Sequence, residues 1–110
     1  MIEIPAGLVK QGEKEEEAAR RELEEETGFV AKNIKKVAAA YASPGYSSEL
    51  IKYYLATGLV REKQKYDEDE HIKVEVLKVK DALLLIKKNQ IRDNKTIIGI
   101  NIARDIKRHL

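Results

Sequence analysis

The chain of 110 residues contains no cysteine and no tryptophan, and it has only two prolines. The lack of cysteine excludes disulfides, thiolate catalysis and a cysteine-ligated metal, and it fits a cytoplasmic protein. No apolar stretch approaches the roughly 20 residues that a membrane span needs, and we expect no signal peptide. A formal net charge of +2 gives no strong field toward nucleic acid or an anionic membrane. We therefore expect neither of these as a partner.

The apolar pattern predicts a single domain over residues 1–110 that contains both helices and strands. Hydrophobic residues make up 43% of the chain and charged residues 36%, which suits one modest core under a charged surface. Gly28 is well placed to end the first helix. This mixture of elements indicates an α/β (α+β) sandwich with one layered core. Helices are predicted at residues 13–27, 81–88 and 95–109, and strands at 35–42, 50–60 and 72–79.

The stretch RRELEEETG, residues 20–28, concentrates glutamates where the first predicted helix ends. The C-terminal end of a helix carries partial negative charge, so carboxylates there are disfavoured. Some of this charge is explained by ion pairs at four-residue spacing, each contributing about 0.2–0.5 kcal/mol. Two such ladders are predicted on the helix surface, Glu16–Arg20–Glu24 and Glu17–Arg21–Glu25.

Glu22 and Glu26 have no basic residue three or four positions away on this helix. At about 100° per residue, both point into the sector of Ala18 and Ala19 that should face the protein, whereas Arg20 points away. Two like charges about 4 Å apart repel by roughly 4 kcal/mol at an effective dielectric constant of about 20. A hard divalent cation, Mg²⁺ or Mn²⁺, would offset this cost, and Glu25 is placed to join as a third ligand. The alternatives are a purely acidic surface or a helix that only buffers calcium.

These residues resemble the signature of the Nudix hydrolases. That signature is Gly, five residues, Glu, seven residues, Arg-Glu-hydrophobic, one residue, Glu-Glu, one residue and Gly-hydrophobic. Its last position is usually aliphatic, and here it is aromatic. The signature is filled over residues 7–29 by Gly7, Glu13, Arg21, Glu22, Leu23, Glu25, Glu26, Gly28 and Phe29.

The resemblance implies an α-β-α sandwich with a mixed sheet and a loop–helix–loop that holds divalent metals for pyrophosphate hydrolysis. In the family pattern Glu22 and Glu26 are the principal ligands, joined by Glu25 in some members and by the backbone carbonyl before the first glycine, here Ala6. Arg21 and Glu13 would orient the acids and hold the loop.

The region at residues 41–59 is similar to the ADP-sugar pyrophosphatase branch of that family. Pro44 lies sixteen residues after Gly28, and Gly45 and Glu49 continue the pattern of the branch. The resemblance implies that this loop helps form the substrate cleft, that Glu49 contacts the ribose, and that ADP-ribose is cleaved to AMP and ribose 5-phosphate. Tyr46 keeps dinucleoside polyphosphates open as an alternative substrate class. A non-catalytic nucleotide-binding module is the other alternative.

The general base is expected in the acidic segment at residues 66–72. The branch places a catalytic glutamate on a loop at this point. Glu68 aligns best with it, and Glu70 is the second candidate.

Members of the family carry additional strands before the motif, but here only residues 1–6 precede Gly7. In the ADP-sugar branch those strands complete the sheet, contact the adenine and help build a homodimer. The resemblance therefore implies an N-terminally truncated Nudix domain and a homodimer in the full-length form.

Overall fold

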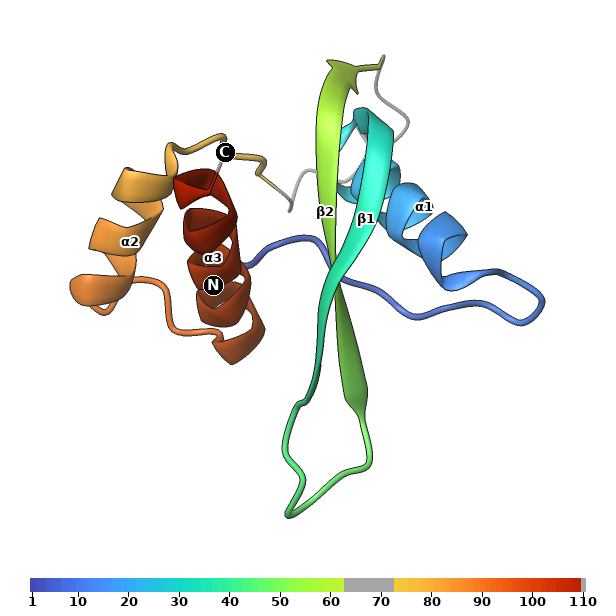
Figure 1. The fold of residues 1–110 in the computed structure, drawn as a ribbon, viewed down its shortest axis with the longest axis horizontal. Helices are drawn as coiled ribbons and strands as arrows, with labels where there is room; N and C mark the ends of the chain where they lie inside the picture. The colour runs from blue at the N-terminus through green and yellow to red at the C-terminus, as the bar shows by residue number, and fades with distance from the viewer. Residues whose placement is uncertain (63–72, 110) are drawn as a thin grey trace. The chain divides into compact units, whose positions relative to one another are not determined.

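The computed structural model describes residues 1–62 and 73–109, which contain three helices and a two-stranded antiparallel sheet (Figure 1). In these residues the sheet consists of β1 and β2 alone, joined by a turn in which the Ala42 amide donates to the Glu49 carbonyl at 3.0 Å. None of the helices described is long and apolar enough to cross a membrane. The elements are α1 (Glu15–Thr27), β1 (Phe29–Tyr41), β2 (Leu50–Arg61), α2 (Val79–Lys87) and α3 (Asn94–Arg108).

The chain divides into two compact units, and the strands contribute to both. The motif unit contains the predicted metal-binding motif with α1 and the adjoining parts of the strands. The helix-pair unit contains α2, α3, the hairpin turn and the first four residues. The motif unit comprises Pro5–Lys36 and Tyr54–Glu75, and the helix-pair unit comprises Met1–Ile4, Val37–Tyr53 and Val76–Leu110.

Helix α1 begins two residues later than predicted and ends at the predicted glycine. Gly28 has a φ of 78°, and its amide donates to the Glu24 carbonyl, which is the left-handed ending that glycine favours. The Thr27 hydroxyl donates to the Leu23 carbonyl at 2.6 Å and accepts the Phe29 amide at 3.1 Å. The turn from helix to strand therefore takes a single residue.

Strand β1 begins at Phe29, earlier than the predicted start at residue 35. The Glu62 amide donates to the Gly28 carbonyl at 2.8 Å. The segments that form β1 and β2 therefore already pair at the residue where α1 ends. This pairing is non-local, and side-chain alternation does not reveal it. Strand β2 matches its predicted range to within one residue.

The predicted strand at residues 72–79 is wrong for its described part. Residues 73–78 have no regular structure, and Val79 already begins α2. Val76 and Leu77 are 78% and 42% exposed. A strand needs a neighbour for its backbone hydrogen bonds, and residues 73–78 pair with neither β1 nor β2. Both C-terminal helices are confirmed, with ends shifted by one or two residues.

In the helix-pair unit, α3 is capped by a polar cluster that also holds the start of the chain. Asp93 Oδ2 accepts the Thr96 amide at 3.1 Å and the Thr96 hydroxyl at 2.6 Å. The Thr96 hydroxyl in turn accepts the Ile4 amide at 3.0 Å. Lys95 Nζ lies 2.6 Å from Glu3 Oε1 and 3.0 Å from Asp93 Oδ2. Residues 3 and 4 are thereby fastened to the first turn of α3.

Thr96→Val should destabilise the helix-pair unit. Thr96 is 1% exposed, and a valine of similar shape leaves the partly buried Ile4 amide without its acceptor. We expect the free energy of unfolding in urea to fall by roughly 1–3 kcal/mol. Thr96→Ser, which keeps the hydroxyl, should lose much less. Unchanged stability of Thr96→Val would contradict this account, because the hydroxyl hydrogen bonds would then contribute nothing.

Candidate metal site

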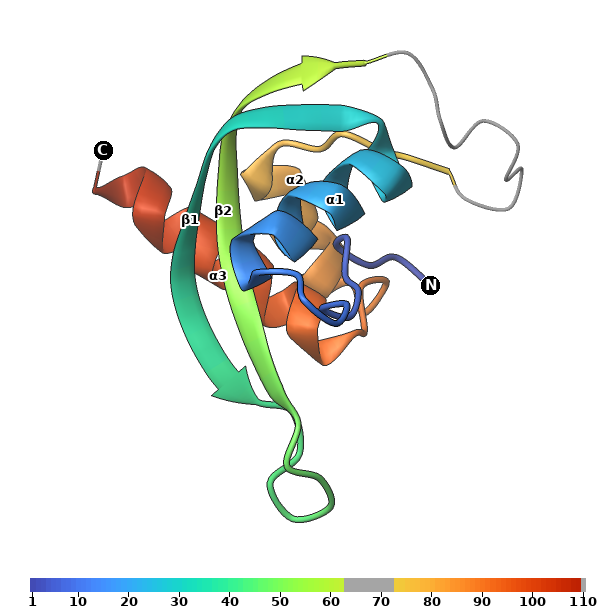
Figure 2. The ribbon, with the colours of Figure 1, turned by 90° about the vertical axis from the view of Figure 1, so that its right-hand side faces the viewer.

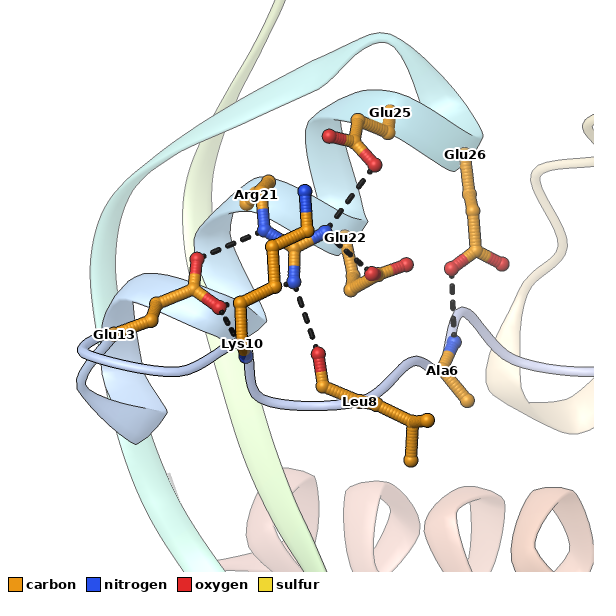
Figure 3. A network of polar contacts seen from close by, with 8 residues as sticks. All are labelled: Ala6, Leu8, Lys10, Glu13, Arg21, Glu22, Glu25 and Glu26. Carbon is orange, nitrogen blue, oxygen red and sulfur yellow. Dashed lines mark hydrogen bonds and ion pairs between the residues drawn. The ribbon is translucent and has the colours of Figure 1, made fainter.

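The carboxylates of Glu22 and Glu26 both approach the backbone of residues 6 and 7 (Figure 3). Glu26 Oε2 accepts the Ala6 amide at 3.2 Å. A Cβ atom placed on Gly7 would lie 2.1 Å from Glu22 Cδ and 2.3–2.4 Å from its two oxygens. Because glycine has no Cβ, the Glu22 carboxylate can lie directly against this backbone. The predicted direction of the two acids, toward the rest of the protein, matches this arrangement.

Arg21 joins the loop to the acids of α1. Its Nε and Nη2 donate to the two carboxylate oxygens of Glu13 at 2.8 and 3.1 Å, and Nη2 also donates to the Leu8 carbonyl at 3.0 Å. Its Nη1 lies 2.5 Å from Glu22 Oε1 and 3.3 Å from Glu25 Oε1. One guanidinium thus uses its planar fork to fix the loop and one of the two central carboxylates.

Two expectations about ion pairs are corrected here. Glu22 does have a basic partner, because the long side chain of its sequence neighbour Arg21 reaches it. Arg20 does not simply point to solvent, since its Nη1 donates to the Ala31 carbonyl of β1 at 2.7 Å. Helix α1 lies beside the first part of β1 (Figures 1 and 2), and the bond from Arg20 shows that its side of the helix faces that strand. The expected pair between Arg21 and Glu25 is present.

The Arg21 guanidinium has a strong electrostatic effect on Glu13. Its hydrogen bonds, together with the Lys10 amide at 3.0 Å, lower the pKa of the Glu13 carboxyl from 4.5 to about 2. Reciprocally, the hydrogen bonds from Glu13 and Glu22 raise the pKa of Arg21. Glu13 therefore stays ionised throughout the physiological range and holds Arg21 in place beside Glu22.

The depressed pKa of Glu13 predicts a loss of stability in acid. Because this pKa is lower in the folded state, the pair with Arg21 stabilises the fold above about pH 4.5, and that contribution disappears as the pH falls toward 2. Urea unfolding of wild-type protein and Glu13→Gln, compared between pH 7 and pH 2, tests this. The stability difference between them should be largest at neutral pH and vanish in acid. A difference that is independent of pH would contradict the assignment.

The donors at residues 6, 22 and 26 fit a small hard cation. Two carboxylates and a backbone carbonyl are oxygen ligands, and Mg²⁺ commonly takes one or two carboxylates with water and substrate phosphates. Across residues 1–62 and 73–109, no three His, Asp or Glu side chains converge closely enough to hold an ion by themselves. Glu25, whose side chain is 55% exposed, lies toward Arg21.

The remaining predicted site residues lie elsewhere in the chain. Pro44, Gly45 and Glu49 belong to the turn of the helix-pair unit, where the Glu49 amide donates to the Ser47 hydroxyl at 3.0 Å. An open cavity of about 350 Å³ beside this turn is lined by Tyr41, Pro44, Tyr46, Ser47 and Ser48. Glu68 and Glu70 lie outside the described residues.

Several contacts of the motif unit were not anticipated from the sequence. The Leu8 carbonyl and the Lys10 amide bind the Arg21–Glu13 pair, but backbone groups carry no residue-type signal. The Arg61 guanidinium lies 5.3 Å from the centre of the Phe29 ring. The aromatic residue at this motif position could have indicated the contact, because the face of an aromatic ring attracts a cation.

Residues 1–98 match the sequence model of the family described as the NUDIX domain. An ADP-ribose pyrophosphatase of Bacillus subtilis (strain 168) is 43% identical over 102 residues, which cover 91% of this chain and 55% of that protein. A methanol dehydrogenase activator of Bacillus methanolicus is 38% identical over 102 residues, covering 91% and 55%. A GDP-mannose pyrophosphatase of Yersinia enterocolitica is 36% identical over 107 residues, covering 94% and 56%.

Among solved structures, a crystal structure of an ADP compounds hydrolase superposes with a TM-score of 0.80 at 25% identity. The match covers 94% of this chain and 56% of that one. The chain thus spans about half the length of the curated relatives that it matches. The expected α/β sandwich fold agrees with this superposition.

Proposed function

This chain belongs to the Nudix family, and from that premise we propose that it hydrolyses the pyrophosphate bond of a nucleoside diphosphate sugar with the help of Mg²⁺ or Mn²⁺. The observation that carries the proposal is the approach of two carboxylates, Glu22 and Glu26, to one short piece of backbone at Ala6 and Gly7. Arg21 already pairs with Glu22, and a divalent cation shared by both carboxylates would offset the repulsion that remains between them.

In this proposal the cation is held by Glu22, Glu26 and the Ala6 carbonyl, with Glu25 assisting from the edge of the site. When bound, a divalent metal neutralises pyrophosphate charge and lowers the pKa of its water. Arg21 orients the Glu22 carboxylate, and Glu13 holds Arg21. We assign the general base to Glu68, with Glu70 as the alternative. A carboxylate of either residue would take the proton from the attacking water.

We propose ADP-ribose as the substrate, with AMP and ribose 5-phosphate as products. Two observations support this choice over other nucleotides. The relative at 43% identity is an ADP-ribose pyrophosphatase. The turn at Pro44, Gly45 and Glu49 follows the pattern of the ADP-sugar branch, and Glu49 would contact the ribose. GDP-mannose, which is in the name of another relative, is the second candidate.

Product analysis by chromatography tests the proposal. The chain would be incubated with Mg²⁺ and, in separate reactions, ADP-ribose, GDP-mannose or a dinucleoside polyphosphate. We expect AMP and ribose 5-phosphate from ADP-ribose, at the highest kcat/KM of the three. Faster cleavage of either competitor would reassign the substrate class. Tight nucleotide binding without any cleavage would instead identify a binding module.

A further inference from the structure

Arg20 lies on the opposite side of α1 from the proposed metal ligands. At about 100° per residue, its side chain is roughly 160° around the helix from Glu22. Its Nη1 donates to the Ala31 carbonyl at 2.7 Å, in a partly buried position. The motif leaves this position unspecified, so the assignment of the metal ligands gives Arg20 no role.

The bond from Arg20 closes a triangle between α1 and β1. Gly28 is the single-residue joint between the two elements. Arg20 lies about 12 Å along the helix from that joint, and Ala31 lies about 10 Å along the strand. A helix fastened only at its joint can swing, whereas one fastened also along its length keeps its direction. Figures 1 and 2 show the helix and the strand running from this shared corner.

The apolar packing near this bond provides little directional restraint. Ala18 on α1 and Ala31 on β1 are each 5% exposed, and alanine offers only a methyl group to interlock. Apolar burial is non-directional, whereas a hydrogen bond requires a defined distance and angle. Another side-chain contact between α1 and this part of the hairpin is longer, at 3.5 Å from the Tyr54 hydroxyl to Glu15 Oε1. The short bond from Arg20 to Ala31 therefore gives the helix a directional restraint that apolar packing does not supply.

The opposite side of the helix is sensitive to that direction. The Glu22 carboxylate occupies the space that a Cβ on Gly7 would fill, and Glu26 accepts the Ala6 amide. A small swing of α1 about Gly28 would move both carboxylates against or away from the same backbone. We propose that Arg20 is a positioning residue, which holds α1 against β1 so that Glu22 and Glu26 keep the spacing a divalent cation needs. This inference rests on the proposed function.

Arg20→Met tests the inference, because methionine keeps an apolar stem but cannot donate to Ala31. Binding of Mn²⁺ would be followed by electron paramagnetic resonance, and the stability of each variant by urea unfolding. We expect Arg20→Met to raise the Mn²⁺ dissociation constant, but by less than the roughly 10–100-fold that losing a direct partner of a metal ligand causes, because Arg20 acts only through the helix. Arg20→Lys, which retains a cationic donor, should recover part of the loss. Arg104→Met is the matched control, since Arg104 pairs with Asp105 on α3.

A second measurement separates this inference from the proposed function. In metal-free protein the Ala6 amide proton resonance reports on the Glu26 carboxylate that accepts it. Arg20→Met should shift this resonance, whereas the Lys10 amide, bound to Glu13, should stay unchanged. An unshifted Ala6 resonance with wild-type Mn²⁺ affinity would overturn the inference and leave Arg20 a purely structural role. If the wild type binds no Mn²⁺, the proposed function fails, and the Ala6 resonance alone decides the role of Arg20.

Discussion

Glu26→Gln is expected to abolish turnover of ADP-ribose while leaving the fold intact. The glutamine amide still offers an oxygen to the Ala6 amide, so the local hydrogen bond can survive. The negative charge is lost, and a neutral amide is a poorer ligand for a hard cation than a carboxylate. Because losing an outer-shell partner already costs about 10–100-fold in activity, removing a direct ligand should cost more.

Steady-state kinetics with Mg²⁺ and circular dichroism of the same samples would check this result. Glu16→Gln is the control, because Glu16 is an exposed glutamate of the same helix and lies outside the proposed site. The control should keep wild-type kcat and KM. Loss of helix content in Glu26→Gln would contradict the account, since the carboxylate would then be needed for folding. Unchanged turnover would remove Glu26 from the metal site.

Gly7→Ala is the second variant with a large expected effect, and its effect should fall on metal binding and not on stability. A methyl group at residue 7 would overlap the Glu22 carboxylate, at 2.1 Å from Cδ. The obstacle is the far end of a flexible side chain, so the fold can adapt by moving that carboxylate away. Where the backbone tolerates it, replacing glycine by alanine stabilises a protein by about 0.4–1 kcal/mol. We therefore expect near-normal or slightly raised stability, with Mn²⁺ affinity reduced at least tenfold, as for a lost outer partner of a ligand.

The double variant Gly7→Ala/Glu22→Asp tests the cause of that loss. Aspartate is one methylene shorter and leaves room for the new methyl group. The double variant should therefore bind Mn²⁺ more tightly than the sum of the two single variants' losses in binding free energy predicts. Strict additivity would show that the carboxylate and residue 7 do not compete for space, because independent sites add.

Local signals in the sequence predicted the helices well but not the full extent of the strands. The end of α1 was readable because Gly28 takes a conformation that other residues avoid. The early start of β1 depends on pairing between Gly28 and Glu62, which lie far apart in the sequence. The alternation at residues 72–79 predicted a strand that has no neighbour among the described residues. Alternation identifies a sequence suited to a strand, but a neighbouring strand must complete its backbone hydrogen bonds.

The sequence predicted which acidic residues form the candidate site, but it did not predict all of the residues that pair with the charged side chains around them. Helical periodicity alone indicated that Glu22 and Glu26 share one direction, and they do approach the same backbone. The rule of three- and four-residue spacing missed the pair between Arg21 and Glu22, because a long guanidinium side chain can reach its sequence neighbour. The same rule assigned Arg20 to a surface ladder, although its partner is a backbone carbonyl of β1.

The central claim, that Glu22 and Glu26 together hold a divalent cation, is tested most directly by titrating the chain with Mn²⁺ and measuring free metal by electron paramagnetic resonance. Wild-type protein and Glu16→Gln should show the same saturable binding, and Glu22→Gln/Glu26→Gln should show none over that concentration range. Wild-type affinity in the double variant would contradict the account, because the cation would then be held by other residues.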